Sequence, residues 1–414
     1  MDINNIRFLD AIKAHTLGEK VYWTEVITFE EWLQLFNVAA IHKVIPMFYE
    51  AVYDCTSYKI FKEQLDKIIK VEVQRQVYFQ ALKTSDFLVL YKHLSDVGIK
   101  PLVVKGLICR NIYPMPDHRA SGDEDLFIPK EQFNLCHEAM LSYGMQVIDD
   151  KSIEDSYEVS YRNRYQYIEL HKNLFPEHSE AYGEFNDIFK HVFDNFIEEE
   201  IQGVKVRTME YTDHLMYLIC HAFKHFLHSG FGVRQLCDII VYSNTYGAKI
   251  NWNRLLEDCR KIKADIFTAA LFDIGKKYLG FSPKKACYIE EWRNIYVDSQ
   301  DLLSEILNSG VYGDSTMSRK HSSNITLNAV ISDKKGKKSK FYVLKTVFPD
   351  SKSLSGRYSY IKKYPFLLPV AWAQRIFKYK KEISKRGSEN SVSESIKIGN
   401  DRIELLRKHG IIKK

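Results

Sequence analysis

The pattern that most constrains the fold is a switch from helical to strand periodicity near residue 99, followed by a return to helical periodicity. Residues 5–98 place apolar side chains at helical spacing and contain few helix breakers. Pro101-Leu102-Val103-Val104 is a short apolar run of strand length, and it ends at Lys105-Gly106. Helical periodicity resumes over residues 211–279. The chain therefore predicts a small β-containing domain between two helical regions.

The segment between the helical regions alternates strands with short helices. Residues 107–113 predict a helix that ends before Pro114, and residues 125–128 predict a strand that Pro129 closes. A second helix is expected at residues 132–143, and further strands are expected at residues 145–148, 157–161 and 165–171. This order predicts an α+β fold with a small mixed β-sheet domain at residues 99–208.

Charge and composition predict the organisation of the C-terminal part. Residues 334–414 carry 22 Lys+Arg and 6 Asp+Glu, a balance of +16, whereas the other residues carry 37 and 47, a balance of −10. Residues 309–340 are rich in Ser, Gly, Asn and Lys and predict loop or weak strand. We expect five segments: a helical region at 1–98, the mixed domain at 99–208, a helical domain at 209–300, an extension packing on the core at 301–381, and a basic, mobile tail at 382–414 with a short helix near 401–409.

The composition is that of a globular protein. The 414 residues are 45% hydrophobic and 27% charged, which is ample for a buried core. No apolar run approaches the roughly 18–20 residues that span a bilayer, and the N-terminal residues show no signal-peptide pattern. None of the seven cysteines forms a C-x-x-C pair, which is typical of reduced thiols. We therefore expect a cytoplasmic protein.

Two aspartates at the start of the second strand are the first candidates for catalysis. Asp123 and Asp125 are two residues apart, so their side chains point to one face, and Glu124 should face the opposite side. Two carboxylates aimed at one point repel each other unless a cation lies between them, and Mg²⁺ prefers such oxygen ligands. Two such ions can clamp the attacking and leaving oxygens of a phosphoryl displacement. The alternative interpretation is a pair of solvated acids at a turn.

Cationic residues upstream of the aspartates predict a phosphate site. Lys105-Gly106 lies where the first strand meets a helix, and there glycine allows close approach of an anion to free N–H groups. Arg119 has forked donors that suit a pair of phosphate oxygens. Together with the acids, these residues indicate a nucleoside triphosphate site, although each alone is also typical of a turn or a surface charge.

Two later segments add candidates. Glu169 lies on the strand at residues 165–171, and we expect it to complete the metal site or to act as general base. A salt bridge on a half-exposed strand is the alternative. His171, on the same face, is expected to be a structural partner. Lys224 and His225 lie on the basic face of a helix, which predicts contact with nucleotide phosphates.

These residues together resemble the nucleotidyltransferase superfamily of DNA polymerase beta, and more narrowly a bacterial uncharacterised nucleotidyltransferase family. The motifs that carry the resemblance are Lys105-Gly106, Tyr113-Pro114, Arg119, Asp123-Glu124-Asp125-Leu126, Glu169-Leu170-His171, Lys224-His225, Phe348-Pro349 and residues 365–372. The likeness covers about residues 30–379. The chain departs from the superfamily in having Lys-Gly where Gly-Ser is usual and Glu124 where an apolar residue is usual. The resemblance implies a polymerase beta-like domain at residues 99–208.

The resemblance also implies an enzyme that moves a nucleoside monophosphate from an NTP, expected to be ATP, to a hydroxyl-type acceptor with release of pyrophosphate. The residues implied to hold Mg²⁺ or Mn²⁺ are Asp123, Asp125 and Glu169, and those implied to bind the nucleotide are Lys105, Gly106, Arg119, Lys224 and His225. The acceptor is expected to be a small molecule, a saccharide, a peptide or RNA. Two alternatives stay open: an RNA- or tRNA-modifying, toxin-like nucleotidyltransferase, and a non-catalytic nucleotide-binding regulatory module.

The basic C-terminal region needs its own interpretation. Its apolar stretch at residues 364–372 is flanked by Lys and Arg. We expect a core-packing segment with a solvated basic tail; the alternatives are a peripheral contact with an anionic membrane surface and an RNA contact.

Overall fold

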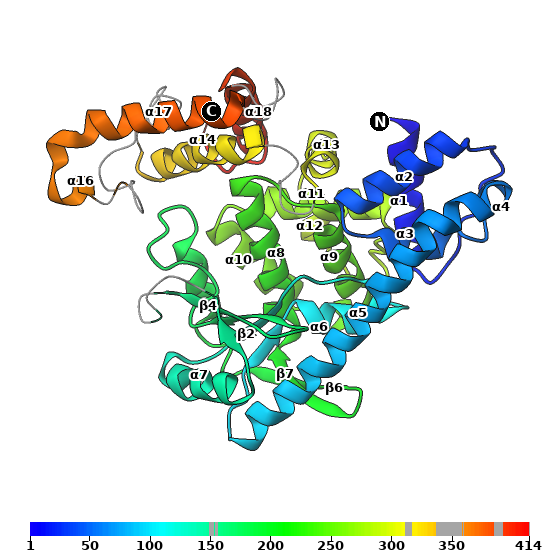
Figure 1. Ribbon diagram of the computed structural model, residues 1–414, viewed down its shortest axis with the longest axis horizontal. Helices are drawn as coiled ribbons and strands as arrows, with labels where there is room; N and C mark the ends of the chain where they lie inside the picture. Colours follow the sequence, from blue (N-terminus) through cyan, green and yellow to red (C-terminus); the bar gives the residue numbers. More distant parts are fainter. Residues whose placement is uncertain are drawn as a thin grey trace. The chain divides into compact units, whose positions relative to one another are not determined.

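A computed structural model describes residues 1–148, 153, 156–310, 317–336, 358, 360–384 and 392–413 (Figure 1). The chain forms two compact units. The first unit comprises Met1–Ala222 with Val233–Leu303, and the second comprises Phe223–Gly232 with Ser304–Lys414. Within the described residues, no helix is both long enough and apolar enough to cross a bilayer.

Five helices begin the first unit: α1 (Ile3–Thr16), α2 (Phe29–Ile41), α3 (Ile45–Val52), α4 (Thr56–Ile60) and α5 (Lys62–Asp96). Helix α2 begins at a capping box, in which Thr28 and Glu31 each accept a backbone N–H of the other. Helix α5 is the longest, at 35 residues, and it contacts the sheet domain through α7 and β7 (Figure 1). Two of its side chains hold the loop before the second strand: Gln80 accepts the N–H of Ser121 at 2.8 Å, and Lys83 donates to the Ser121 carbonyl at 2.7 Å.

The central sheet has five strands in the order β1-β2-β5-β4-β3. They are β1 (Leu102–Val104), β2 (Glu124–Phe127), β3 (Gln146–Val147), β4 (Glu158–Arg162) and β5 (Tyr167–His171). Only β2 and β5 pair in parallel, and the other neighbours in this sheet are antiparallel. The expected strands and the mixed α+β character are therefore confirmed. The parallel pair is the feature that matters for the site, because it fixes which residues of β2 and β5 lie opposite each other.

A second, two-stranded sheet follows, made of β6 (Phe196–Ile201) and β7 (Val204–Met209). Gln202 and Gly203 join these strands, and both have positive φ, at 49° and 81°. Positive φ at both central residues is the geometry of a type I′ turn, which matches the twist of a hairpin. The sequence patterns did not predict these two strands.

The remaining helices that build the sheet domain and its helical neighbour are α6 (Gly106–Asn111), α7 (Phe133–Ser142), α8 (Tyr211–His228), α9 (Val233–Tyr246), α10 (Trp252–Lys261), α11 (Asp265–Tyr278), α12 (Glu290–Arg293) and α13 (Gln300–Ser309). An aromatic cluster stabilises the packing of α10 to α12. Phe272 contacts the rings of Trp252 and Tyr288 at centroid distances of 5.5 and 5.0 Å, and all three side chains are buried. Their burial fixes the helical part of the first unit.

The second unit corrects two expectations. Its helices include α14 (Met317–Lys334), α16 (Tyr360–Lys363), α17 (Leu368–Ser384) and α18 (Val392–Lys408). The prediction of loop or weak strand is wrong for residues 317–334, and the prediction of a mobile tail is wrong for residues 392–400, because α14 and α18 pack on each other. The short helix expected near residues 401–409 is confirmed as the second half of α18. Ile325 contacts the backbone of α18 at Gly399, where an added Cβ would lie 2.9 Å from it. Residues 337–340 and 385–391, together with Phe348-Pro349, lie outside the described residues.

Candidate active site

The acids expected to bind metal lie on one face of the parallel strand pair. The register places Asp125 of β2 directly opposite Glu169 of β5, and Phe127 opposite His171. Because side chains alternate along a strand, Glu169 and His171 share the face of Asp125. One ligand atom from each of Asp125, Glu169 and His171 lies within 4.8 Å of the others. The three side chains can therefore converge on a single cation.

Asp123 lies just before β2 at the edge of this group. The Lys105 ammonium is 3.9 Å from its Oδ2 and 2.8 Å from Oδ2 of Asp125. The Asp123 side chain is 21% exposed and that of Glu169 is 24% exposed, whereas Asp125 is buried. The group is thus anchored in the interior by Asp125 and is open to solvent at Asp123 and Glu169.

The surroundings shift the pKa of Asp125 and that of Glu169 in opposite directions. Burial raises the pKa of Asp125, but Lys105 and a hydrogen bond from His171 at 3.2 Å outweigh it, and the pKa of Asp125 lies well below its usual range. Burial and the neighbouring charge of Asp125 raise the pKa of Glu169 to about 7. The site holds more acid than its own cations neutralise, so an added cation would be stabilised there.

Lys105 is positioned by a strained turn between β1 and α6. Its φ is 61° and its ψ is −109°, a region that residues other than glycine rarely adopt. The Lys105 N–H donates to Nε2 of His214 at 3.0 Å. His214 is fully buried, and burial lowers its pKa to about 3, so it is neutral and can accept this bond. Strain of this kind is held by the surrounding structure and is typical of functional sites.

Gly106 allows the close approach of an anion, and that anion is the carboxylate of Glu124. Glu124 points away from Asp125, as expected, and its Oε2 accepts the N–H of Leu107 at the start of α6 at 2.7 Å. Its Oε1 accepts hydrogen bonds from Arg110 and Ser121, each at 2.9 Å. A Cβ on Gly106 would lie 2.8 Å from the Glu124 carboxyl carbon. The glycine therefore makes room for Glu124, and its expected role beside a triphosphate remains a prediction.

Arg119, which we expected to bind phosphate oxygens, lies in an internal ion pair. Its guanidinium is buried, and it donates to Asp238 through Nε at 3.1 Å and through Nη2 at 2.5 Å. Tyr113 donates to the same carboxylate at 2.8 Å. Burial lowers the pKa of Arg119, but the charge and hydrogen bonds of Asp238 outweigh burial. The pKa of Arg119 therefore lies well above its usual value. Arg119 therefore lies in an internal ion pair that engages its Nε and Nη2, and its role in nucleotide binding remains a prediction.

Two further candidates, Lys224 and His225, belong to the second unit. Lys224 and His225 lie on α8, in the part of that helix that belongs to the second unit. The Asp–Glu cluster belongs to the first unit. Their role in nucleotide binding remains a prediction.

His171 is more central than the sequence indicated. It is buried, it donates to Asp125, and its Nδ1 lies 3.5 Å from Oε2 of Glu158. Glu158 in turn accepts a hydrogen bond from Tyr157 at 2.7 Å. The alternation Glu-Leu-His on β5 was the available signal, since it places both polar side chains on the face of Asp125. A row of polar contacts thus runs from the acid cluster to Tyr157.

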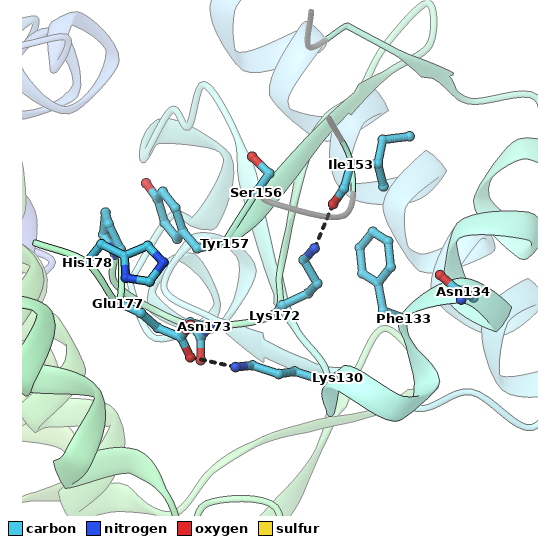
Figure 2. A pocket seen from close by; sticks show the side chains of 11 residues that line it. Lys130, Phe133, Asn134, Ile153, Ser156, Tyr157, Lys172, Asn173, Glu177 and His178 are labelled. Atoms are coloured by element: carbon cyan, nitrogen blue, oxygen red, sulfur yellow. Dashed lines mark hydrogen bonds and ion pairs between the residues drawn. The ribbon is translucent and has the colours of Figure 1, made fainter. Parts of the chain in front are cut away.

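Tyr157 lines a surface cavity of about 540 Å³ (Figure 2). Figure 2 shows Lys130 reaching toward Glu177 and Lys172 reaching toward the Ile153 carbonyl. Phe133 supplies an aromatic side chain to the same wall. None of the cluster's acids lines this cavity, and Tyr157 connects it to the cluster, because the ring centroids of Tyr157 and His171 are 6.4 Å apart.

Comparison with known proteins identifies the family of the chain. No curated protein and no solved structure matches it. The model of a family described as uncharacterised nucleotidyltransferase matches residues 29–280, which include β1 to β7 and every acid of the cluster. The chain therefore belongs to the uncharacterised nucleotidyltransferase family, and it is a nucleotidyltransferase enzyme.

Proposed function

We propose that the chain transfers a nucleoside monophosphate from an NTP to a hydroxyl group of an acceptor and releases pyrophosphate, with Asp123, Asp125 and Glu169 holding Mg²⁺ or Mn²⁺. The observation that carries this proposal is the register of β2 and β5, which sets Asp125 against Glu169 beside the Lys105 ammonium. In a nucleotidyltransferase, acids converging in this way next to a lysine suit a metal-bound triphosphate. We also propose a polymerase beta-like arrangement of the domain, and ATP as the donor, because the family resemblance implies them.

The residues present fit a divalent cation. Oδ2 of Asp125 is buried and accepts no hydrogen bond from the described residues, although the Lys105 ammonium pairs with it. A buried carboxylate oxygen of this kind is suited to a metal ion. His171 orients the other oxygen of Asp125, as partners of ligating carboxylates do. When bound, the cation would neutralise charge that develops on the phosphate oxygens.

The chain's own residues then have separate tasks. Lys105 is held by its turn close to the acids, and its ammonium would bind an oxygen of the donor phosphates. Glu169, with a pKa near neutrality, would complete the cation site or accept the proton of the acceptor hydroxyl. The cavity beside Tyr157 is the proposed entrance for the acceptor, because Tyr157 lines it and contacts both Glu158 and the ring of His171.

The proposal is tested with variants of the acids. Asp123→Ala and Asp125→Ala should abolish pyrophosphate release with Mg²⁺ and an NTP, while circular dichroism shows a folded chain. Glu169→Gln separates its two roles: weaker Mn²⁺ binding by electron paramagnetic resonance indicates a ligand, and unchanged Mn²⁺ binding with lost turnover indicates a base. Unchanged turnover in either aspartate variant would refute the proposal, and NTP binding without turnover in the wild type would indicate a non-catalytic module.

A further inference from the structure

Helix α17 and the turn before it expose a row of apolar side chains. Phe366 lies in the turn η6 (Pro365–Leu367) and is 76% exposed, Val370 is 47% exposed, and Phe377 is 74% exposed. Val370, Ala373 and Phe377 are spaced by three and four positions in α17, which places them on one helical face, and Phe366 lies in the turn just before that helix. A contiguous exposed apolar row is uncommon on a protein surface and marks a contact site.

The opposite face of the same helix is already packed. Ala371 and Ile361 are fully buried against each other, and Tyr358, Tyr360 and Leu368 pack around them. This small core fixes which face of α17 points inward within the second unit. Among the residues that the structure describes, the Phe366–Phe377 row takes no part in that core and is exposed to a partner.

The charge around the row is strongly positive. Residues 360–381 contain six Lys+Arg and no Asp or Glu: Lys362, Lys363, Arg375, Lys378, Lys380 and Lys381. Residues 334–414 as a whole carry a balance of +16. An apolar helical face with basic residues around it is the pattern of a helix that lies in a membrane interface and binds anionic lipid.

We propose that η6 and α17 bind the surface of an anionic lipid bilayer, with Phe366, Val370 and Phe377 inserted among the acyl chains. A second copy of the chain is disfavoured as partner, because two copies of residues 360–384, each with six Lys+Arg and one Glu, would repel each other. RNA would be attracted by the cations, but a continuous aliphatic and aromatic row matches acyl chains better than separate stacked bases. Lipid is the partner that accounts for both the charge and the apolar row.

The test is co-sedimentation of the full chain with vesicles of phosphatidylcholine, with and without phosphatidylglycerol. We expect binding to the anionic vesicles, weaker binding to the neutral ones, and loss of binding as salt is raised. Phe366→Ser and Phe377→Ser should each weaken binding about tenfold, which is the effect of removing one buried aromatic side chain. Phe79→Ser is the matched control, since Phe79 is 46% exposed on α5 in the first unit, and it should bind like the wild type.

Several outcomes would overturn the proposal. One is a wild-type chain that does not sediment with anionic vesicles, and another is a Phe366→Ser/Phe377→Ser chain that binds as tightly as the wild type. The chain could instead bind RNA, measured by retention on a filter, or dimerise, measured in the ultracentrifuge. If the wild type showed either property without binding vesicles, and the double variant lost it, the lipid proposal would be wrong. None of these measurements depends on nucleotidyl transfer, so the lipid proposal and the catalytic proposal fail or succeed separately.

Discussion

Replacing Gly106 with alanine should destabilise the protein, although alanine is the better helix former. Gly106 is the first residue of α6, and its φ is not in the left-handed region, so the backbone itself accepts alanine. The added methyl group would meet the Glu124 carboxylate, whose carbon would be 2.8 Å away. Glu124 is fully buried and bonded to Arg110, Ser121 and the Leu107 N–H, so it cannot move aside without losing these partners.

The magnitude follows from the two opposing effects. Helix propensity favours alanine over glycine by at most about 1 kcal/mol. Displacing Glu124 separates it from Arg110, which is itself buried, and breaking a buried ion pair costs roughly 3–5 kcal/mol. We therefore expect Gly106→Ala to lower the free energy of unfolding by about 2–4 kcal/mol. Helix propensity alone predicts that Gly106→Ala stabilises the protein, so the sign of the measured change distinguishes the two effects.

The assay is a urea titration followed by circular dichroism. It should be repeated in a Glu124→Ala background, where the methyl group has no carboxylate to meet and Gly106→Ala should cost little or stabilise. An unchanged or raised free energy of unfolding for Gly106→Ala in the wild-type background would refute the packing of Glu124 against Gly106. An equal loss in both backgrounds would show that the destabilisation has another cause.

Two further predictions concern buried groups. Asp238→Ala leaves the buried Arg119 guanidinium without its carboxylate and should lower the free energy of unfolding by about 3–5 kcal/mol in the same titration; a loss under 1 kcal/mol would contradict the assignment of Arg119 to a structural pair. His214 has a pKa of about 3 in the folded protein against 6.5 in a free histidine, so the unfolded chain binds the extra proton first. Stability should therefore fall as pH drops below 6.5, by about 2 kcal/mol from this group at pH 5, and His214→Leu should lose that share of the pH dependence. If His214→Leu and the wild type showed the same dependence of unfolding free energy on pH, the assigned contribution of His214 would be wrong.

Much of the sheet and part of the site could be predicted from sequence, because both depend on local patterns. Strand-length apolar runs gave β1, β2, β4 and β5, and the alternation of side chains gave the shared face of Asp125 and Glu169. The register that sets these two acids opposite each other depends on the parallel pairing of β2 with β5. That pairing joins residues more than forty positions apart, and no local pattern specifies it.

The errors come from partners that are distant in sequence. Arg119 looked available for phosphate because its partner Asp238 is 119 positions away. Glu124 replaces the apolar residue that is usual between the aspartates, yet it accepts the N–H of Leu107 in the first turn of α6 and pairs with Arg110. Predicting these contacts requires the packing of β2 against that helix. Helix α14 and the first half of α18, residues 392–400, were missed because their polar sequences become helical only by packing.

The central claim is that Asp125 belongs to the centre that transfers the nucleotide. The direct measurement supplies each of the four NTPs with Mg²⁺, a metabolite extract and RNA, and follows pyrophosphate release and nucleotide adducts by mass spectrometry. We predict release and an adduct with the wild type, a loss of at least about a hundredfold with Asp125→Asn, and no loss with Asp54→Asn, whose carboxylate is half exposed and pairs with Lys59. Full activity of Asp125→Asn beside an active wild type would contradict the claim.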